Sequence, residues 1–317
     1  MTRLIRLYPL AILCLLAQVF GAWGFAVHRH INAAAVDALS PPLRGWFLPH
    51  RDWLFDHAVD ADKRKHMVKR EPPKHYVDLD APALSCLDTL GPAPWFDRAV
   101  LACKEDTLWE YGVLPWNIQW AYMRLVAAMD TGIAESILRA ASDLGHYAAD
   151  AHVPLHTTIN YNGQLTGQDG IHALWETRLP ERYASEYLLV VPPPEVIRDV
   201  GSWAWQTVWQ SHAAVDSVLD FEKALVDGWS GDLMVREKRG RTMALQRVPE
   251  WCDVYHGAMD GMVERRWRAS IHGVASLWTS AWISAGQPDL GGVLLPRKEG
   301  RLPWHRWWRR GEEFESD

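Results

Sequence analysis

A run of metal-ligand side chains between residues 146 and 176 constrains this chain more than any other feature. The five side chains are separated by gaps of four, six, sixteen and four residues. Residues four apart lie one turn above each other on a helix, so the first pair and the last pair each form a two-ligand clamp. Two clamps predict more than one metal ion. The five candidate ligands, all of zinc-binding types, are His146, Asp150, His156, His172 and Glu176.

Fourteen histidines are spread over the chain, and any one of them alone would be interpreted as a surface group or a satisfied core group. The five side chains are informative because they occur together. Pro154 lies between the two clamps, and proline disturbs a helix because it lacks an amide hydrogen. This break comes where His156 must turn toward the same centre, so the spacing and the helix breaker indicate one site.

The first 22 residues have the layout of a secretory signal peptide rather than of a membrane span. Two arginines precede an apolar run, and two small residues follow it. We expect cleavage after residues 1–22, a mature chain that begins at Trp23, and export to the periplasm or the extracellular space. Phe20 is bulky where a small residue is preferred before the cut. A retained N-terminal anchor is therefore the alternative.

Charge limits the partners that this chain can bind. Removing residues 1–22 takes away two arginines and no acidic residue, so the formal net charge changes from −6 to −8. A protein this acidic does not bind a polyanion by bulk electrostatics. If the substrate is a nucleic acid, its phosphate must be captured locally by metal.

Three cysteines remain after the predicted cleavage, and none has the short paired spacing of a zinc knuckle. Zinc would therefore be held by histidine and carboxylate. In an exported protein, Cys86 and Cys103 can form a disulfide across a segment rich in proline and glycine. Cys252 would remain as a free thiol.

Helical periodicity dominates the remaining chain and predicts an all-α fold. Ile118, Tyr122, Leu125 and Met129 recur on one helix face, and similar apolar patterns occur near both ends of the expected domain. No pair of segments alternates convincingly enough to predict two strands.

The organisation that we expect is one multi-helix domain over residues 23–286, large enough for a sizeable core. Prolines and glycines break the segment 71–115, which predicts a long structured loop. A second polar loop, 160–170, lies between the two clamps and should rim the site. The segment 287–317 is a tail rich in Trp and Arg that could pack back, remain disordered, or make a peripheral contact with a membrane or a partner.

Further ligand candidates lie before the five-residue run. Asp60 and His75 are fifteen residues apart, and Asp62 is a rival for the role of Asp60, which we prefer on spacing alone. At the mature start, the α-amino group of Trp23 has a pKa low enough for zinc to displace its proton. The amine and carbonyl of Trp23 could chelate an ion that His28 reaches from the first helical turn.

This pattern resembles the zinc-dependent phospholipases C and the related P1/S1-type single-strand nucleases. The resemblance covers most of the span from Trp23 to about Pro180 and includes the N-terminal Trp, nine ligand positions and a Pro-Leu-His sequence. It implies an all-helical fold of that type around three zinc ions. It also implies a ligand set: Asp60, His75, His146 and Asp150 for a first zinc; His156, His172 and Glu176 for a second; and Trp23 and His28, with Asp150 bridging, for a third.

The substrate class stays open because the chain combines features of both branches. Glu176 as the final carboxylate and the short loop before the last histidine resemble the phospholipases. The spacing from Trp23 to His28 and the gap from Asp60 to His75 resemble the nucleases. The substrate is therefore expected to be a phospholipid head group, with single-stranded DNA or RNA as the alternative, and no obligate protein partner is inferred.

The reaction implied is hydrolysis of a phosphodiester by water that zinc activates, since zinc lowers the pKa of bound water to about 7. Asp60 and Asp150 are the expected catalytic carboxylates through the ions that they hold. The nucleases place a cation shortly after the first Asp, and Lys63 and Arg64 are the candidates here, against the alternative of a solvated basic run. His152 matches no ligand position of the family.

A third interpretation is a metal-binding helical protein without catalysis, such as a carboxylate-bridged di-iron bundle. Such bundles repeat a Glu followed three residues later by His on two helices. No Glu in this sequence is followed by His at that distance. The sequence therefore favours the hydrolase.

Overall fold

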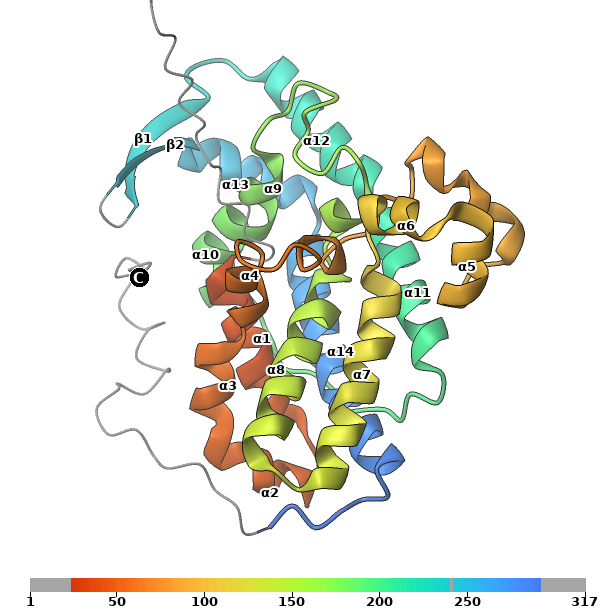
Figure 1. Ribbon diagram of the computed structural model, residues 1–317. Helices are drawn as coiled ribbons and strands as arrows, with labels where there is room; N and C mark the ends of the chain where they lie inside the picture. The colour runs from red at the N-terminus through yellow and green to blue at the C-terminus, as the bar shows by residue number, and fades with distance from the viewer. Residues whose placement is uncertain (1–23, 240–241, 292–317) are drawn as a thin grey trace, which may run out of the picture.

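Four long helices form the core of the protein, described here from a computed structural model that covers residues 24–239 and 242–291. α8 and α14 each contact all three of the other long helices (Figure 1). Their buried faces belong to one continuous apolar cluster. The prediction of a mostly helical fold is confirmed. The four helices are α1 (Phe25–Ala38), α7 (Leu114–Thr131), α8 (Ala134–Asp150) and α14 (Met262–Ser284).

Local sequence explains where these helices begin and end. Pro115 stands in the first turn of α7, where its missing amide hydrogen costs nothing. Gly132 follows the last residue of α7 in the left-handed conformation, with φ 64°, which glycine adopts without strain. On α8, Ile137, Ala141 and Leu144 recur at helical spacing and are buried. This stripe seats α8 in the core and thereby fixes the position of its carboxyl end.

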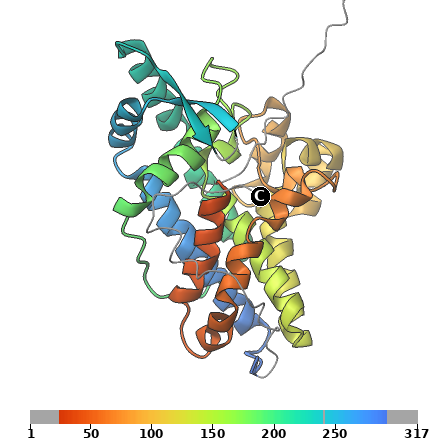
Figure 2. The ribbon, with the colours of Figure 1, turned by 90° about the vertical axis from the view of Figure 1, so that its left-hand side faces the viewer.

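Further helices surround this core, and Figure 2 shows the four core helices upright below the hairpin. α3 packs beside α1, and α11 packs beside α7. The remaining helices and 3₁₀ turns of this shell are α2 (Leu43–Phe47), η1 (Leu48–His50), α3 (Arg51–His57), α4 (Asp60–Arg64), α10 (Leu179–Tyr183), η6 (Ala184–Glu186), α11 (Val200–His212), α12 (Val215–Gly228) and α13 (Pro249–Ala258).

The segment 71–115 is not the long loop that its prolines predict. Its prolines stand in the first turns of 3₁₀ helices or between elements, positions that need no amide hydrogen. A disulfide joins Cys86 to Cys103, as the sequence suggested, and leaves Cys252 as a buried free thiol. The elements of this segment are η2 (Pro72–Lys74), η3 (Pro82–Leu90), α5 (Phe96–Cys103) and α6 (Glu105–Tyr111).

A two-stranded antiparallel hairpin corrects the expectation that no pair of strands would form. β1 (Met234–Arg239) pairs with β2 (Thr242–Arg247) in a register that sets Arg236 opposite Leu245. The sequence signal was hidden because β1 carries charged residues on both of its faces. Apolar and polar residues therefore do not alternate along β1 as they do in a half-buried strand.

Several sequence predictions concern residues outside the described part of the chain. These are the signal peptide 1–22, the ligand Trp23, and the tail from residue 292 onward. The loop 160–170 is described and contains turns but no helix or strand. Among the described helices, none combines the length and the apolar character needed to cross a membrane.

Candidate metal centre

The carboxyl end of α8 presents His146 and Asp150 one turn apart on the same face, as their spacing predicts. Asp150 Oδ2 lies 3.3 Å from His146 Nε2 and 2.8 Å from His75 Nδ1. The other carboxylate oxygen, Oδ1, lies 3.3 Å from Nε2 of His28, which comes from the first turns of α1. All four side chains are buried. Asp150 therefore joins histidines from three separate segments.

The second predicted clamp lies close by. His172 belongs to the short helix α9 (Ile171–Ala173), and Glu176 to η5 (Leu174–Arg178), a single π-helical turn. Glu176 Oε2 lies 3.0 Å from His172 Nε2 and 3.6 Å from His156 Nε2. His156 follows Pro154 in the 3₁₀ turn η4 (Pro154–Thr157). The break after α8 thus turns His156 toward the clamp.

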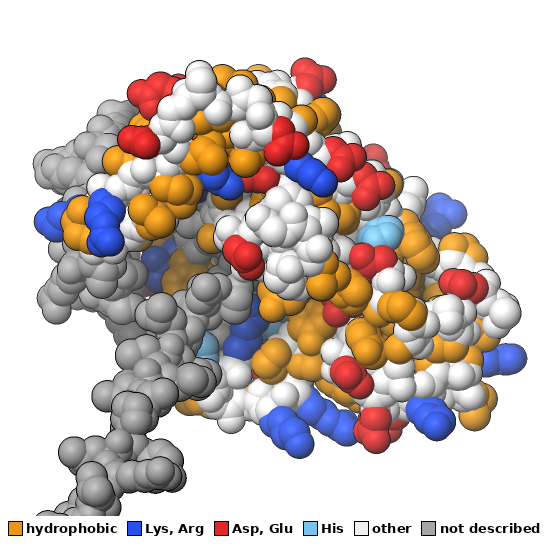
Figure 3. Space-filling view, turned by 90° about the horizontal axis from the view of Figure 1, so that it is seen from above, with side chains coloured by type: hydrophobic (Ala, Val, Ile, Leu, Met, Phe, Trp, Pro, Cys, Tyr) orange, Lys and Arg blue, Asp and Glu red, His pale blue; other side chains and the backbone are white. Residues whose placement is uncertain are grey.

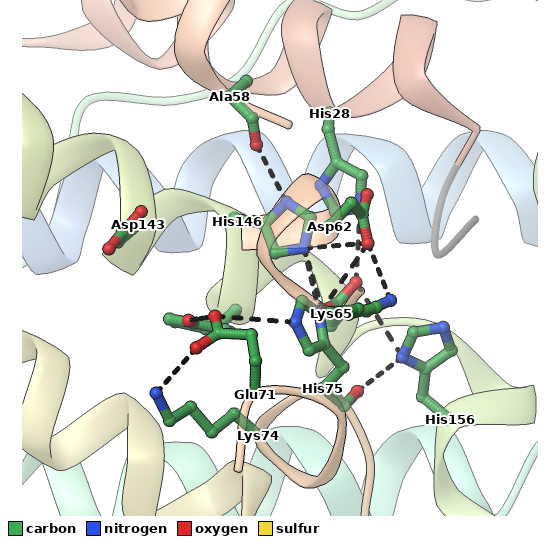
Figure 4. A network of polar contacts seen from close by, with 12 residues as sticks. His28, Ala58, Asp62, Lys65, Glu71, Lys74, His75, Asp143, His146 and His156 are labelled. Carbon is green, nitrogen blue, oxygen red and sulfur yellow. Dashed lines mark hydrogen bonds and ion pairs between the residues drawn. The ribbon is translucent and has the colours of Figure 1, made fainter. Parts of the chain in front are cut away.

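These side chains form three adjoining groups, in each of which one ligand atom per residue lies within 4.8 Å of the others. His146 belongs to two groups, and Asp150 Oδ1 is 3.8 Å from His156 Nδ1. Figure 4 shows the rings of His28, His75 and His146 turned toward one another. Such buried groups can hold metal ions. The groups are His28, His146 and Asp150; Asp62, His75 and His146; and His156, His172 and Glu176.

Backbone carbonyls hold three of these histidine rings in place. Nδ1 of His146 lies 2.8 Å from the carbonyl of Ala58, Nδ1 of His156 lies 2.6 Å from the carbonyl of His75, and Nδ1 of His172 lies 3.0 Å from that of Tyr161. A ring that donates its Nδ1 hydrogen to a carbonyl has Nε2 free as a lone-pair donor, which is how metal-binding histidines are held. In each case Nε2 faces the cluster.

The segments after His75 and around His156 also exchange backbone hydrogen bonds. The amide of Val77 donates to the carbonyl of His156 at 2.9 Å, and the amide of Leu79 donates to that of Thr157 at 3.0 Å. Together with the bond from the His156 ring to the His75 carbonyl, they tie two ligand-bearing segments directly to each other.

The structure brings Asp62, and not Asp60, to the cluster. Asp62 lies 3.6 Å from His146 Nε2 and 4.0 Å from His75 Nδ1, with its side chain 3% exposed. Asp60 lies against His57 and Lys63 instead, with its side chain 28% exposed. In the structure Asp62, and not the preferred Asp60, therefore lies with the other candidate ligands. Asp60 and Asp62 are two positions apart, so their side chains point about 200° apart around α4. Sequence spacing could not show which of the two faces the cluster.

The cation beside the cluster is Lys65, not Lys63 or Arg64. Lys65 Nζ lies 2.7 Å from Asp62 Oδ1. Burial alone would lower its pKa, but the carboxylates of Asp62 and its neighbours raise it, so Lys65 is charged. Lys63 is half exposed and pairs with Asp60. Arg64 points the other way and pairs with acidic side chains behind the cluster.

Several buried atoms of the cluster have no hydrogen bond within it. They include Oδ2 of Asp62, Oδ1 of Asp150, Oε2 of Glu176 and both ring nitrogens of His28. Burial opposes charge on His146, yet Asp150 and Asp62 raise its pKa to about 9, so without metal this ring takes up a proton. Buried polar atoms that make no hydrogen bond are costly. The donor set fits metal ions that would replace such protons and satisfy these atoms.

The chain just after Trp23 lies against the second clamp. The amide of Gly24 donates to the carbonyl of Glu176 at 3.1 Å. A Cβ at Gly24 would come within 2.6 Å of Thr177 Oγ1, so only glycine fits this close approach. His28 follows one turn later in the cluster. Trp23 itself is outside the described residues, but its neighbour already contacts a predicted ligand.

A supporting layer behind His75 was not predicted from the sequence. Glu71 Oε1 lies 3.9 Å from His75 Nε2, and Glu71 accepts hydrogen bonds from Tyr147 and Lys74. Arg64 pairs with Glu71 and with a carboxylate of α8. The only sequence signal is that Glu71 precedes His75 by four residues and Tyr147 adjoins a ligand. His152, which matched no ligand position, is buried outside the three groups.

Comparison with known proteins does not assign this chain to a family. No protein-family model matches it, and no curated protein is significantly similar to it. The resemblance drawn from its motifs therefore stays a prediction.

Proposed function

We propose that this chain is an exported zinc-dependent phosphodiesterase of the phospholipase C type. The observation that carries the proposal is the set of three adjoining buried groups, linked through His146 and Asp150, with Lys65 at their edge. Several cations held side by side next to an ammonium group suit a substrate that gathers negative charge as it reacts, as a phosphoryl group does.

The donor chemistry supports zinc. Imidazole nitrogen and carboxylate oxygen, without thiolate, are ligands that zinc accepts in catalytic sites. We assign one ion to each group and add the amine and carbonyl of Trp23 to the group of His28. When bound, zinc supplies Lewis acidity toward phosphoryl oxygens and makes water a nucleophile near neutral pH. The first-zinc ligands then become Asp62, His75, His146 and Asp150.

The chain's own residues position these groups. Asp150 lies within 3.3 Å of His28, His75 and His146. It therefore connects the first group, which contains His28, with the second, which contains His75. The carbonyls of Ala58 and Tyr161 fix the rings of His146 and His172. Lys65 holds a positive charge within reach of a phosphate at the cluster and replaces Lys63 and Arg64 in the role that the resemblance implied.

A nuclease is the second candidate, supported by one aromatic ring. Tyr161 is 39% exposed in the loop before α9, and its ring centroid lies 6.1 Å from that of His172. An exposed ring beside the site could stack on a base of single-stranded nucleic acid. Export is proposed for both candidates, and the disulfide between Cys86 and Cys103 supports it because such bonds persist in oxidising compartments.

The test is metal analysis of the purified protein combined with parallel assays on phosphatidylcholine and single-stranded DNA. We expect about three zinc ions per chain, hydrolysis of phosphatidylcholine, and loss of activity with a chelator that added zinc reverses. Preferential cleavage of DNA would select the nuclease. Bound metal without turnover of either substrate would support the non-catalytic alternative.

A further inference from the structure

One face of the β1–β2 hairpin is exposed and combines apolar with cationic side chains. The strand register places Arg236 opposite Leu245 and Lys238 opposite Met243, and directly paired residues lie on the same face of a sheet. Met243 is 57% exposed and Leu245 60% exposed. We call this the outward face and define it as Met234, Arg236, Lys238, Met243 and Leu245, all exposed.

The opposite face of the hairpin fastens it beside the metal centre. Glu237 accepts two hydrogen bonds from Arg178, at 2.6 and 2.7 Å. Arg178 follows the ligand Glu176 by two residues in the same π-helical turn. At the base of the hairpin, Arg247 stands opposite Met234, on the same side as the outward face, and its guanidinium pairs with Glu222 of α12. The outward face therefore has a fixed position relative to the second clamp.

Figure 3 looks onto the end of the molecule where hairpin and cluster lie, and orange and blue side chains gather at its left edge, over the hairpin. The chain as a whole carries a formal net charge of −6. The outward face nevertheless contains two cations and no carboxylate among its five residues. A surface that is both basic and aliphatic is complementary to a partner with an anionic surface and an apolar interior.

We propose that the outward face docks on an anionic phospholipid surface, with Met243 and Leu245 entering the interface and Arg236 and Lys238 contacting the head groups. This inference rests on the proposed phosphodiesterase function and selects lipid as its substrate class. Aliphatic side chains gain by burial in a lipid interface, and each nearby cation adds about 1 kcal/mol of attraction to anionic lipid. Single-stranded nucleic acid would instead need aromatic rings for stacking, and the outward face has none.

Sedimentation with vesicles on ice measures the docking directly. The full protein is mixed with vesicles of phosphatidylcholine alone or of phosphatidylcholine with phosphatidylglycerol. We expect stronger binding to the anionic vesicles. The double variant Met243→Ser with Leu245→Ser should lower the partition coefficient at least about tenfold. Arg236→Gln with Lys238→Gln should lower it by about fivefold per cation and remove the preference for anionic vesicles.

The matched control is Leu101→Ser with Met123→Ser, two apolar residues that are 84% and 61% exposed on α5 and α7. This variant should bind vesicles as the unchanged protein does. Circular dichroism melting of each variant shows that the fold is kept. Equal vesicle binding by the hairpin variants and the control would overturn the proposal. A second result would also overturn it: the unchanged protein binds single-stranded DNA but no vesicles, and the hairpin variants lose the DNA binding.

Hydrolysis of a soluble diester, bis(p-nitrophenyl) phosphate, separates this inference from the proposed function. It requires the metal centre but no docking surface, so the hairpin variants should retain it. Hydrolysis without vesicle binding would refute the docking and leave the phosphodiesterase standing. Hairpin-dependent vesicle binding without hydrolysis would confirm the docking and refute the phosphodiesterase.

Discussion

Replacing Asp62 with asparagine tests which acidic residue of α4 serves the metal centre. Asparagine keeps the shape of the side chain and removes its charge. Lys65 then loses the carboxylate 2.7 Å away, and His75 and His146 lose the third member of their group. Breaking a buried pair by removing one partner costs about 3–5 kcal/mol. Even a change in a residue that only orients a metal ligand lowers metal affinity or activity by about 10–100-fold.

For Asp62→Asn we therefore expect a loss of about one metal ion per chain and a fall in turnover of at least about 100-fold. Asp60→Asn is the matched control, because it makes the same chemical change two residues away. Its partners are partly exposed, so the free energy of unfolding should change by no more than about 1 kcal/mol. Metal content by mass spectrometry and hydrolysis of bis(p-nitrophenyl) phosphate are measured on the same samples. Full metal content and turnover in Asp62→Asn, with losses in Asp60→Asn, would refute this placement.

Three further outcomes are expected. Asp150→Asn should remove about two ions and cost more activity than Glu176→Gln, which should remove about one; equal metal content in the two variants would contradict a bridging Asp150. A tag fused ahead of Trp23 should give a folded protein with about one zinc ion fewer, because the nitrogen of Trp23 is then an amide without the lone pair of an amine. Cleavage before Trp23 should restore the zinc content and the rate of hydrolysis. A fused form with the full zinc content would exclude the Trp23 amine as a ligand. Burial and the neighbouring carboxylate of Asp80 raise the pKa of Asp78 to about 7. Between about pH 4 and pH 7 the folded chain therefore keeps a proton that the unfolded chain has lost, and the free energy of unfolding falls as pH rises through this window. Asp78→Asn should therefore raise the free energy of unfolding in urea at about pH 8 and leave it unchanged at about pH 4; the same gain at both values would contradict the shift.

The parts of the site that lie on one helix or one turn could be predicted from sequence. His146 with Asp150, and His172 with Glu176, meet because a four-residue spacing fixes their geometry locally. Asp62 could not be separated from Asp60, because α4 is only five residues long and its rotation is set by packing against other segments. Lys65 was missed for the same reason, since only the inward position of Asp62 brings it to the cluster.

The helical core was predictable because its apolar stripes repeat over many residues, as on α7 and α14. The hairpin was not, because β1 carries charged residues on both of its faces, so apolar and polar residues do not alternate along it as they do in a half-buried strand. In the segment 71–115, the prolines and glycines predict a loop. Pro72 and Pro82 instead stand in the first turns of 3₁₀ helices, and the Cys86–Cys103 bond joins η3 to α5.

We expect the hydrogen bonds between the segments at His75 and His156 to form late in folding. The bond from the His156 ring to the His75 carbonyl spans 81 residues of chain. Closing a loop of this length costs chain entropy before the contact can stabilise the chain, so we expect this contact to form late. A chain that has made only its local helices offers metal two isolated pairs of ligands, and complete uptake has to wait for the long loop to close. During refolding, the gain of the full complement of metal should therefore coincide with the last step of tertiary assembly rather than with the appearance of helix.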